Sequence, residues 1–287
     1  MKQRMYDNVQ ELIPAYRDFL AQLISFNSVY GNERAAQLYV KERMLKNGLL
    51  VDEHFSRSDN NSINLVSKIQ GRNSQSYKSL ILNAHCDIAP IDCFECWSRP
   101  PLGGEINEDI IYGRGSQDDK AGIAIMLLIA QVLERSNIKL NGDLILQVVI
   151  EDETTGNGSK TLVENGYTAD GVIIIDGTWS ERIIYAHLGQ IWINVYIEGE
   201  PVAACVAARG KNPIYIAMEF IQELQNEIFI LNNETPPFEG IDNPNFINVG
   251  KFNSGMWAGS VPAFAKMEIQ IGFAERHSPD DILVLVK

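Results

Sequence analysis

Three apolar runs of the sequence end in acidic or imidazole side chains: SLILNAHCD at residues 79–87, DLILQVVIEDE at residues 143–153 and DGVIIID at residues 170–176. Short apolar runs bounded by turn-forming residues are typical of buried strands. The carboxyl ends of parallel strands open onto one crevice, where ligand sites form. We therefore expect the polar residues that close these runs to lie close together.

A fourth motif, YGRGSQDDKAG at residues 112–122, leads into a strongly helical stretch. Apolar residues recur at three- and four-residue spacing over residues 118–136, which predicts a helix with Asp118 and Asp119 at its N-terminus. Imidazole and carboxylate groups are the donors that Zn²⁺ takes. The resulting candidate site residues are His85, Asp118, Asp152, Glu153 and Asp176, with Asp87 as a supporting residue.

Strand and helix patterns alternate through the first part of the chain, which predicts an α/β domain with a mostly parallel central sheet flanked by helices. After His187 the pattern changes to strands with alternating polarity around one long helix. We expect residues 1–187 to form the first domain. We expect residues 188–287 to form a smaller α+β domain of strand–helix–strand–strand–helix order.

The charge and hydropathy of the chain exclude several classes of partner. The formal charge of −13 disfavours binding to nucleic acid and to anionic membranes. No apolar run approaches the eighteen residues of a membrane span. The N-terminal residues form an amphipathic pattern without the features of a signal peptide, so we expect a cytoplasmic protein.

The four cysteines are too few for a disulfide scaffold in a chain of this length. Cys93 and Cys96 have the spacing of a redox pair or a zinc knuckle, but no second pair completes a tetrahedral site. We therefore expect two ordinary thiols in a loop.

Taken together, the motifs resemble a family of zinc-dependent deacylases and exopeptidases. This family contains acetylornithine deacetylase, succinyl-diaminopimelate desuccinylase, aminoacylase and glutamate carboxypeptidase. The similarity begins near residue 10 and is most specific over residues 85–122, where H-x-D is followed by Trp97, Pro100 and Y-G-R-G-x-x-D-x-K-x-G. The other matching motifs are EDETTGNG at residues 151–158, IDGT at residues 175–178 and GKFNSGMWAGSVPA at residues 250–263.

The resemblance implies a catalytic domain that carries two Zn²⁺ ions and a lid domain through which two subunits form a homodimer. It implies hydrolysis of an amide bond in an N-acyl amino acid or small peptide by a metal-activated water, although Co²⁺ or Mn²⁺ could use the same ligands. The resemblance also implies that His85 is a ligand of one ion and that Asp118 bridges both ions. Glu153 and Asp176 would each be a further ligand, one for each metal. Asp152 matches the general base, and Asp87 the residue behind the histidine.

The chemistry of the residues agrees with these roles. Two adjacent carboxylates on a turn could divide the work, since one can face the metal while the other takes a proton from water. Asp87 lies two residues from His85 on the same strand face and could accept the second N–H of the imidazole.

Three departures from the family pattern favour an alternative, a metal-binding or dimerising relative with impaired catalysis. The family's C-terminal His ligand is missing before Lys287, so we expect a C-terminally truncated reading frame. Ala203 stands where the lid usually carries a His, and losing an oxyanion donor costs about 10²–10³ in rate. Asp152 is one methylene shorter than the usual Glu.

A nucleotide-binding protein is a third hypothesis, which the glycine spacing at GRGSQDD does not support.

Overall fold

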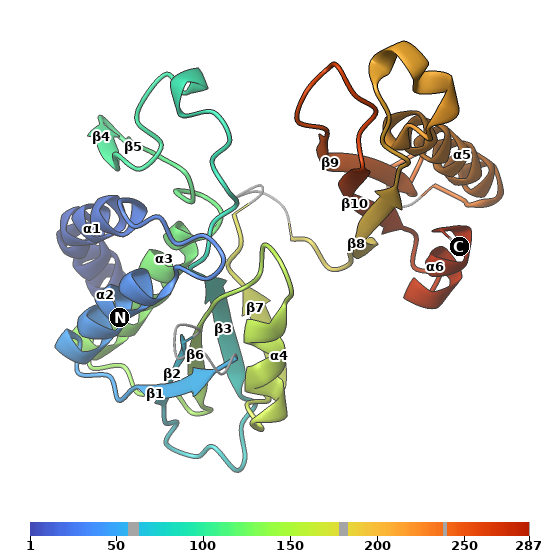
Figure 1. The fold of residues 1–287 in the computed structure, drawn as a ribbon. Coiled ribbons are helices and arrows are strands. Elements are labelled where there is room, and N and C mark those ends of the chain that lie inside the picture. Colours follow the sequence, from blue (N-terminus) through green and yellow to red (C-terminus); the bar gives the residue numbers. More distant parts are fainter. Residues whose placement is uncertain (57–62, 178–182, 238–239, 287) are drawn as a thin grey trace. The chain divides into compact units, whose positions relative to one another are not determined.

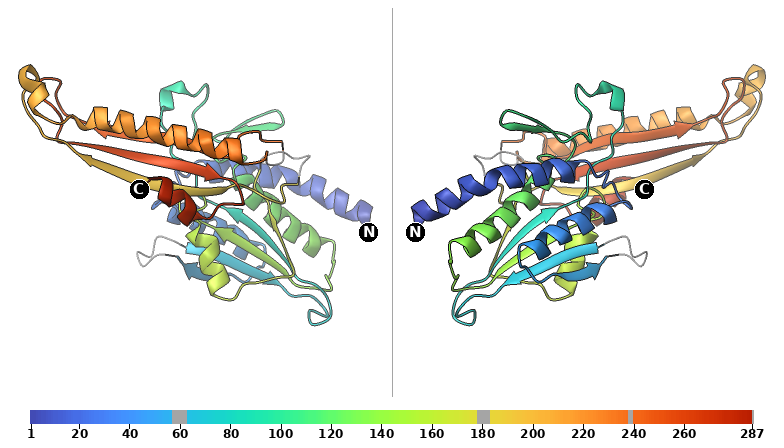
Figure 2. Two further views of the ribbon diagram at one scale, coloured as in Figure 1. Left: turned by 90° about the vertical axis from the view of Figure 1, so that its right-hand side faces the viewer. Right: turned by 90° about the vertical axis from the view of Figure 1, so that its left-hand side faces the viewer.

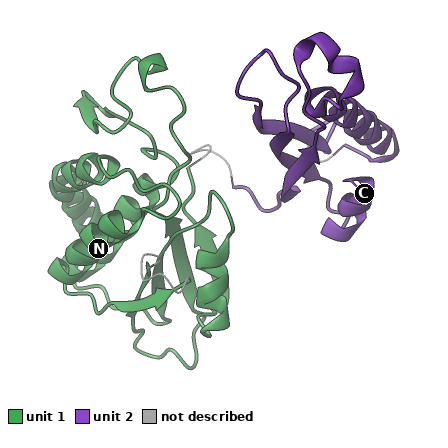
Figure 3. Ribbon diagram, viewed as in Figure 1, with its two compact units in different colours: residues 1–181 green, residues 182–287 purple. Residues whose placement is uncertain are grey.

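The computed structural model describes residues 1–56, 63–177, 183–237 and 240–286, and the chain divides into two compact units (Figure 3). Residues 1–181 form unit 1 and residues 182–287 form unit 2. The division falls a few residues before the boundary expected from the sequence at residues 187/188. Residues 183–188 contain neither helix nor strand, so this connection carries no regular structure that would set the boundary.

Unit 1 is built on a five-stranded sheet (Figure 1). Its order is β1-β2-β6-β3-β7, with parallel pairing of β6 with β3 and of β3 with β7. β2 pairs antiparallel with both of its neighbours, so it is the one strand of this sheet that runs against the other four. The strands are β1 (Asp52–Phe55), β2 (Ile63–Ile69), β3 (Leu80–His85), β6 (Leu144–Val149) and β7 (Gly171–Ile174). The expectation of a mostly parallel sheet is confirmed.

Helices cover both faces of this sheet. The larger core packs α1 (Lys2–Ile24), α2 (Arg34–Lys46) and α3 (Lys120–Arg135) against side chains such as Leu82 and Leu146. On the opposite face, Leu162 of α4 (Asn157–Glu164) packs against Ile81 and Ile145. Successive strand residues point to opposite faces, and in β3 and β6 both faces are buried, which explains the nearly continuous apolar runs of these two strands. The apolar side chains of Val172, Ile173 and Ile174 in β7 are exposed.

The segment expected to be loop-rich, residues 89–112, contains two short elements. A one-turn 3₁₀ helix spans Phe94–Cys96, and β4 (Glu105–Asn107) pairs with β5 (Ile110–Tyr112) in a hairpin. Cys93 and Cys96 form a disulfide bond, so the expectation of two ordinary thiols was wrong. The 3₁₀ turn brings the two side chains together, and spacing alone did not reveal that.

Unit 2 has the expected strand–helix–strand–strand–helix order. Its antiparallel sheet has the order β8-β10-β9, and α5 and α6 pack on one face of it (Figure 2). The elements are β8 (Gly189–Glu198), α5 (Pro213–Glu234), β9 (Phe246–Ser254), β10 (Phe264–Phe273) and α6 (Pro279–Val286). Alternate residues of β8 are more exposed, as the polarity pattern indicated. Among the described residues, none of the helices is long and apolar enough to cross a bilayer.

Candidate metal centre

Three parallel strands of unit 1 end at the same edge of the sheet and place candidate residues there (Figure 1). His85 is the last residue of β3, and the turn that holds Asp152 and Glu153 follows β6. Asp176 lies two residues beyond the end of β7. The parallel pairing therefore gathers residues that are up to 91 positions apart in the sequence.

The start of α3 brings the remaining carboxylate to this edge. Asp119 is the N-cap of α3, is fully buried, and accepts the backbone N–H of His85 at its Oδ2 (3.1 Å). Lys120 is also fully buried, and its Nζ donates to the carbonyl oxygens of Leu23 (3.0 Å) and Phe26 (2.8 Å). These bonds fix α3 against β3 and the end of α1, which leaves Asp118 next to the imidazole.

A close approach between α3 and the end of β7 completes the arrangement. A Cβ atom at Gly122 would overlap both the Asp119 carboxylate and the backbone carbonyl of Ile175. Only glycine permits this separation, and Asp176 follows Ile175 directly. The glycine of the DDKAG motif therefore sets the distance between the strand that carries Asp176 and the helix that follows Asp118.

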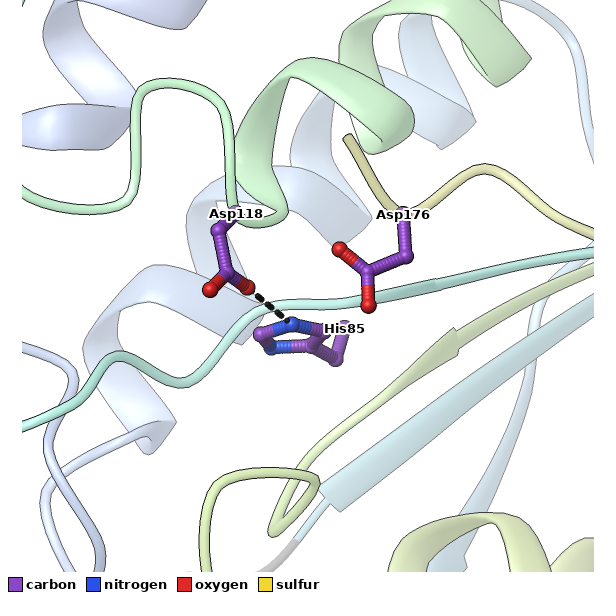
Figure 4. A group of neighbouring side chains, drawn as sticks. All are labelled: His85, Asp118 and Asp176. Carbon is purple, nitrogen blue, oxygen red and sulfur yellow. Dashed lines mark hydrogen bonds and ion pairs between the residues drawn. The ribbon is translucent and has the colours of Figure 1, made fainter. Parts of the chain in front are cut away.

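His85, Asp118 and Asp176 each offer one donor atom, and the three atoms all lie within 4.8 Å of one another (Figure 4). His85 Nε2 is 2.8 Å from Asp118 Oδ1. The imidazole is buried, whereas the Asp118 side chain is 60% exposed, so the group opens to solvent on the carboxylate side. One nitrogen and two carboxylate oxygens that converge in this way fit a divalent cation such as Zn²⁺.

The buried carboxylate of Asp87 connects this group to the turn after β6. Its Oδ1 accepts the N–H of Asp152 (3.2 Å) and its Oδ2 accepts the N–H of Glu153 (3.1 Å). His85 Nδ1 lies 3.1 Å from the backbone carbonyl oxygen of Asp87 and 3.4 Å from Oδ1. Asp87 therefore contacts the imidazole through its backbone carbonyl as well as through the expected side chain. Its carboxylate mainly accepts the two hydrogen bonds from the turn after β6.

The surroundings of several carboxyl groups near the site disfavour their ionised forms. Burial first, and then the charges of neighbouring acids, raises the pKa values of Asp152, Glu153 and Asp176. Burial also raises the pKa of Asp119 to about 8. A divalent cation would relieve this repulsion, because it favours the ionised form of every carboxylate near it.

The hydrogen bond between His85 and Asp118 shifts the pKa values of these two side chains in opposite directions. Burial disfavours a charged imidazole, but the hydrogen bonds with Asp118 and Asp87 outweigh it and raise the pKa of His85 to about 11. The same bond from His85 lowers the pKa of Asp118, and the Arg114 guanidinium adds to that effect. The contact thus favours a protonated imidazole beside an ionised carboxylate, and a shared cation would take the place of that proton.

Comparison with known proteins assigns the chain to a family. Residues 81–273 match the family described as Peptidase family M20/M25/M40. The chain belongs to this family. The resemblance seen in the motifs is thereby confirmed, and membership of a metallopeptidase family implies a divalent cation.

Among curated M20 relatives, the chain is 33% identical over 268 residues to the N-formyl-4-amino-5-aminomethyl-2-methylpyrimidine deformylase of Halalkalibacterium halodurans. That alignment covers 87% of this chain and 59% of the relative. The chain is also 25% identical over 210 residues to a probable succinyl-diaminopimelate desuccinylase of Staphylococcus epidermidis, which covers 72% of this chain and 50% of that protein. The chain thus spans between half and three fifths of these relatives.

Solved M20 structures share the fold at lower identity. The di-peptidase Dug1p of Saccharomyces cerevisiae superposes with a TM-score of 0.81 at 14% identity, covering 99% of this chain and 74% of that one. The metallo-carboxypeptidase Sso-CP2 of Sulfolobus solfataricus superposes with a TM-score of 0.73 at 18% identity, covering 93% and 73%. The predicted architecture of a zinc-exopeptidase-like α/β domain with an α+β domain is that of these proteins.

The M20 chain brings together His85, Asp118 and Asp176, while Glu153 lies outside this group of three. Glu153 Oε1 accepts the N–H of Ala89 (3.2 Å), although its pKa responds to the charge of Asp118. Thr178, the last residue of the third motif, lies outside the described residues.

Sequence reasoning missed three buried ionisable residues that build this M20 site. The sequence pattern places Asp119 at a helix start without a further role, and it assigns no role to Lys120 or Glu151. Both carboxylate oxygens of Glu151 accept a hydroxyl hydrogen bond at 2.6 Å, one from Ser56 and one from Thr155. All three side chains are fully buried, and their position within two residues of Asp118 or Glu153 was the available signal.

Proposed function

We propose that the whole protein to which this chain belongs is a metal-dependent hydrolase that cleaves the amide bond of an N-acylated amine. The observation that carries the proposal is the convergence of His85, Asp118 and Asp176, from three separate segments, to within 4.8 Å of one another. This set fits one divalent cation, with Zn²⁺ as the first choice and Co²⁺ or Mn²⁺ as alternatives. Asp118 and Glu153 would contribute to a second zinc in the complete protein.

A divalent cation, when bound, lowers the pKa of water and polarises a carbonyl group. The remaining work belongs to the side chains around the site. We assign the general base to Asp152, because its backbone is held by Asp87 and burial raises the pKa of its carboxyl group. A base with a raised pKa accepts a proton from water at neutral pH more readily and can pass it to the leaving nitrogen.

The substrate class follows from the relatives. Two of them, at 33% and 37% identity, are named as deformylases of an N-formylated aminomethylpyrimidine. We therefore propose a small N-acyl group, with formamides as the first candidates, ahead of N-succinyl and N-acetyl amino acids and of dipeptides. A homodimer formed through unit 2 and a cytoplasmic location remain part of this proposal. Light scattering on the protein tests the dimer.

Release of a primary amine from a panel of N-formyl, N-acetyl and N-succinyl amines, and of dipeptides, tests this function in the full-length protein. We expect amine release that chelation abolishes and Zn²⁺ restores, and no release by an Asp152→Ala variant that still binds metal. Metal analysis that finds no zinc, together with an inert panel, would contradict the proposal.

Ala203 supports a second candidate, a metal-binding relative without turnover. Its methyl side chain offers no hydrogen-bond donor, and Ala203 forms an isolated bridge with Ser260 in unit 2. This candidate predicts metal binding with no amine release from any compound in the panel. Chelator-sensitive turnover would exclude it.

A further inference from the structure

The loop between β3 and β4 contains a disulfide bond that the proposed function does not use. Cys93 and Cys96 flank the 3₁₀ turn, and their Cα atoms are 5.3 Å apart. Cys96 is exposed and Cys93 is partly exposed, so the bond is accessible to a thiol from solution. The other two cysteines are unpaired, since Cys86 is buried in the core and Cys205 lies in unit 2.

Two contacts connect this loop to residues that lie near the candidate metal centre in the structure or in the sequence. At its start, the N–H of Ala89 donates to Oε1 of Glu153 (3.2 Å). At its far end, the ring of Trp97, the residue after Cys96, lies 5.2 Å from the guanidinium carbon of Arg114. Arg114 is four residues before Asp118, in the segment that leads to the start of α3. The N–H of Glu153 in turn donates to the Asp87 carboxylate beside His85 (3.1 Å). The disulfide therefore lies between a contact with Glu153 and a contact with Arg114.

Space beside the loop allows it to change shape. A cavity of about 440 Å³ lies against it, and both cysteines, Trp97 and Arg114 are among the residues that line the cavity. If the bond between the sulfur atoms is broken, the turn loses its covalent closure, and the Trp97 ring can move away from Arg114 into this space.

We propose that Cys93 and Cys96 are a reversible dithiol–disulfide site that controls, through Ala89 and Trp97, how tightly the His85–Asp118–Asp176 group holds a divalent cation. The inference rests on the metal centre of the proposed function and adds its regulation. The disulfide form is the tight-binding form. Groups that are ordered before binding lose less conformational freedom when the ligand arrives.

The reductant is a dithiol. One of its thiolates attacks a sulfur of the Cys93–Cys96 bond, forms a mixed disulfide and releases the other cysteine as a thiolate. The second thiol of the reductant then attacks the mixed disulfide, which releases the remaining cysteine and leaves the reductant as a cyclic disulfide. Two electrons and two protons pass to the protein, and two electrons and two protons leave the reductant.

Mn²⁺ binding to the oxidised and reduced forms of the protein tests the inference. The protein is reduced with dithiothreitol, desalted without oxygen, and titrated with Mn²⁺ while the resonance of the free ion is followed by electron paramagnetic resonance. Mn²⁺ prefers oxygen and nitrogen donors over thiols, so the liberated cysteines do not compete with the site. We expect the dissociation constant to rise by at least about threefold on reduction, through the loss of preordering. Titration of thiols in the unfolded chain should find Cys86 and Cys205 before reduction, and all four cysteines after it.

Two variants serve as controls. The double variant Cys93→Ser/Cys96→Ser should bind Mn²⁺ as weakly as the reduced protein and should not respond to dithiothreitol. Cys205→Ser should respond as the wild type does. Tryptophan fluorescence of the wild type should change on reduction, and Trp97→Phe should remove most of that change.

Equal Mn²⁺ affinity in the two redox states overturns this inference and leaves the proposed function intact. So does a thiol titration that finds four thiols in protein kept under air. A protein that binds no Mn²⁺ in either state, as His85→Ala is expected to behave, overturns the metal centre itself and this inference with it.

Discussion

Asp87 and Asp152 are joined by a hydrogen bond of 3.2 Å from the Asp152 N–H to the Asp87 carboxylate. The bond connects Asp87, two residues beyond the end of β3, to the turn after β6, and Asp87 is almost completely buried. A backbone contact of this kind orients the proposed base without using its side chain, so the carboxyl group of Asp152 stays available for chemistry.

Replacing Asp87 with Asn should weaken the site while preserving the shape of the side chain. An amide has one acceptor oxygen, so one of the two N–H groups of the turn would face an NH₂ group instead. We expect a loss of about 10–100-fold in metal affinity or activity, as for other residues that orient metal ligands. Calorimetric titration with Zn²⁺ measures the affinity.

Asp170→Asn is the matched control for this variant. The Asp170 carboxylate also accepts a backbone N–H, that of Ser79 (2.7 Å), but at the opposite end of β3. The Asp170→Asn variant should therefore bind metal with the same affinity as the wild type. Equal losses in both variants would show that the effect of Asp87 is on general stability and not on the site.

Asp118→Ala should remove one of the three donor atoms without disturbing the core, because this side chain is 60% exposed. Since loss of an orienting residue alone costs about 10–100-fold, loss of the donor itself should cost at least about 100-fold in affinity. Asp109→Ala, a substitution at a fully exposed side chain, should bind metal as the wild type does. Unchanged binding by Asp118→Ala would place the cation elsewhere.

Metal binding should release a proton from His85. The pKa of His85 is raised to about 11, so the metal-free imidazole is charged at pH 8, whereas a ligand histidine must be neutral. Each unit of pH between 7 and 10 should therefore raise the affinity about tenfold for one released proton. Zn²⁺ titrations in buffers with different ionisation enthalpies count the protons, and a count of zero would contradict the assignment of His85.

The same shift fixes the sign of the pH dependence of stability in the metal-free protein. The folded state holds the His85 proton more tightly than the unfolded chain does, so this contribution to stability is complete below about pH 6.5. It is lost as the pH rises toward about 11. Urea denaturation of metal-free protein at several pH values would show the decline, and saturating Zn²⁺ should diminish it.

Gly122→Val should damage both fold and site. The new side chain would overlap Asp119 and the carbonyl of Ile175, and relief of that overlap must move α3 away from β7. We expect a loss of about 1–3 kcal/mol in the free energy of unfolding, together with weaker metal binding. Gly171→Ala in β7 is the control, because its Cβ would meet only Leu80 at 3.7 Å.

The sequence predicted which candidate residues lie together where local pattern determines geometry. His85 and Asp176 could be placed together because each follows an apolar strand, and the strands of an α/β domain end at a common edge. Asp118 could be added because it precedes a clear helix.

The pattern could not show which charged residues the tertiary structure buries. Asp119, Lys120 and Glu151 look like surface residues in the sequence, and only packing of α1, α3 and β3 reveals them as fully buried partners of the backbone and of hydroxyl groups. The Cys93–Cys96 bond was missed for a similar reason. Its formation depends on a single 3₁₀ turn within a segment that has no periodic pattern.

The order in which the chain emerges during synthesis has a consequence for this site. His85 and Asp118 are made early, but Asp176 follows β7, which completes the parallel part of the sheet. A nascent chain that stops short of β7 can present only two of the three donors. Ribosome-bound intermediates of this length should therefore not hold a divalent cation at this group, and binding of such an ion would report that β7 has paired with β3.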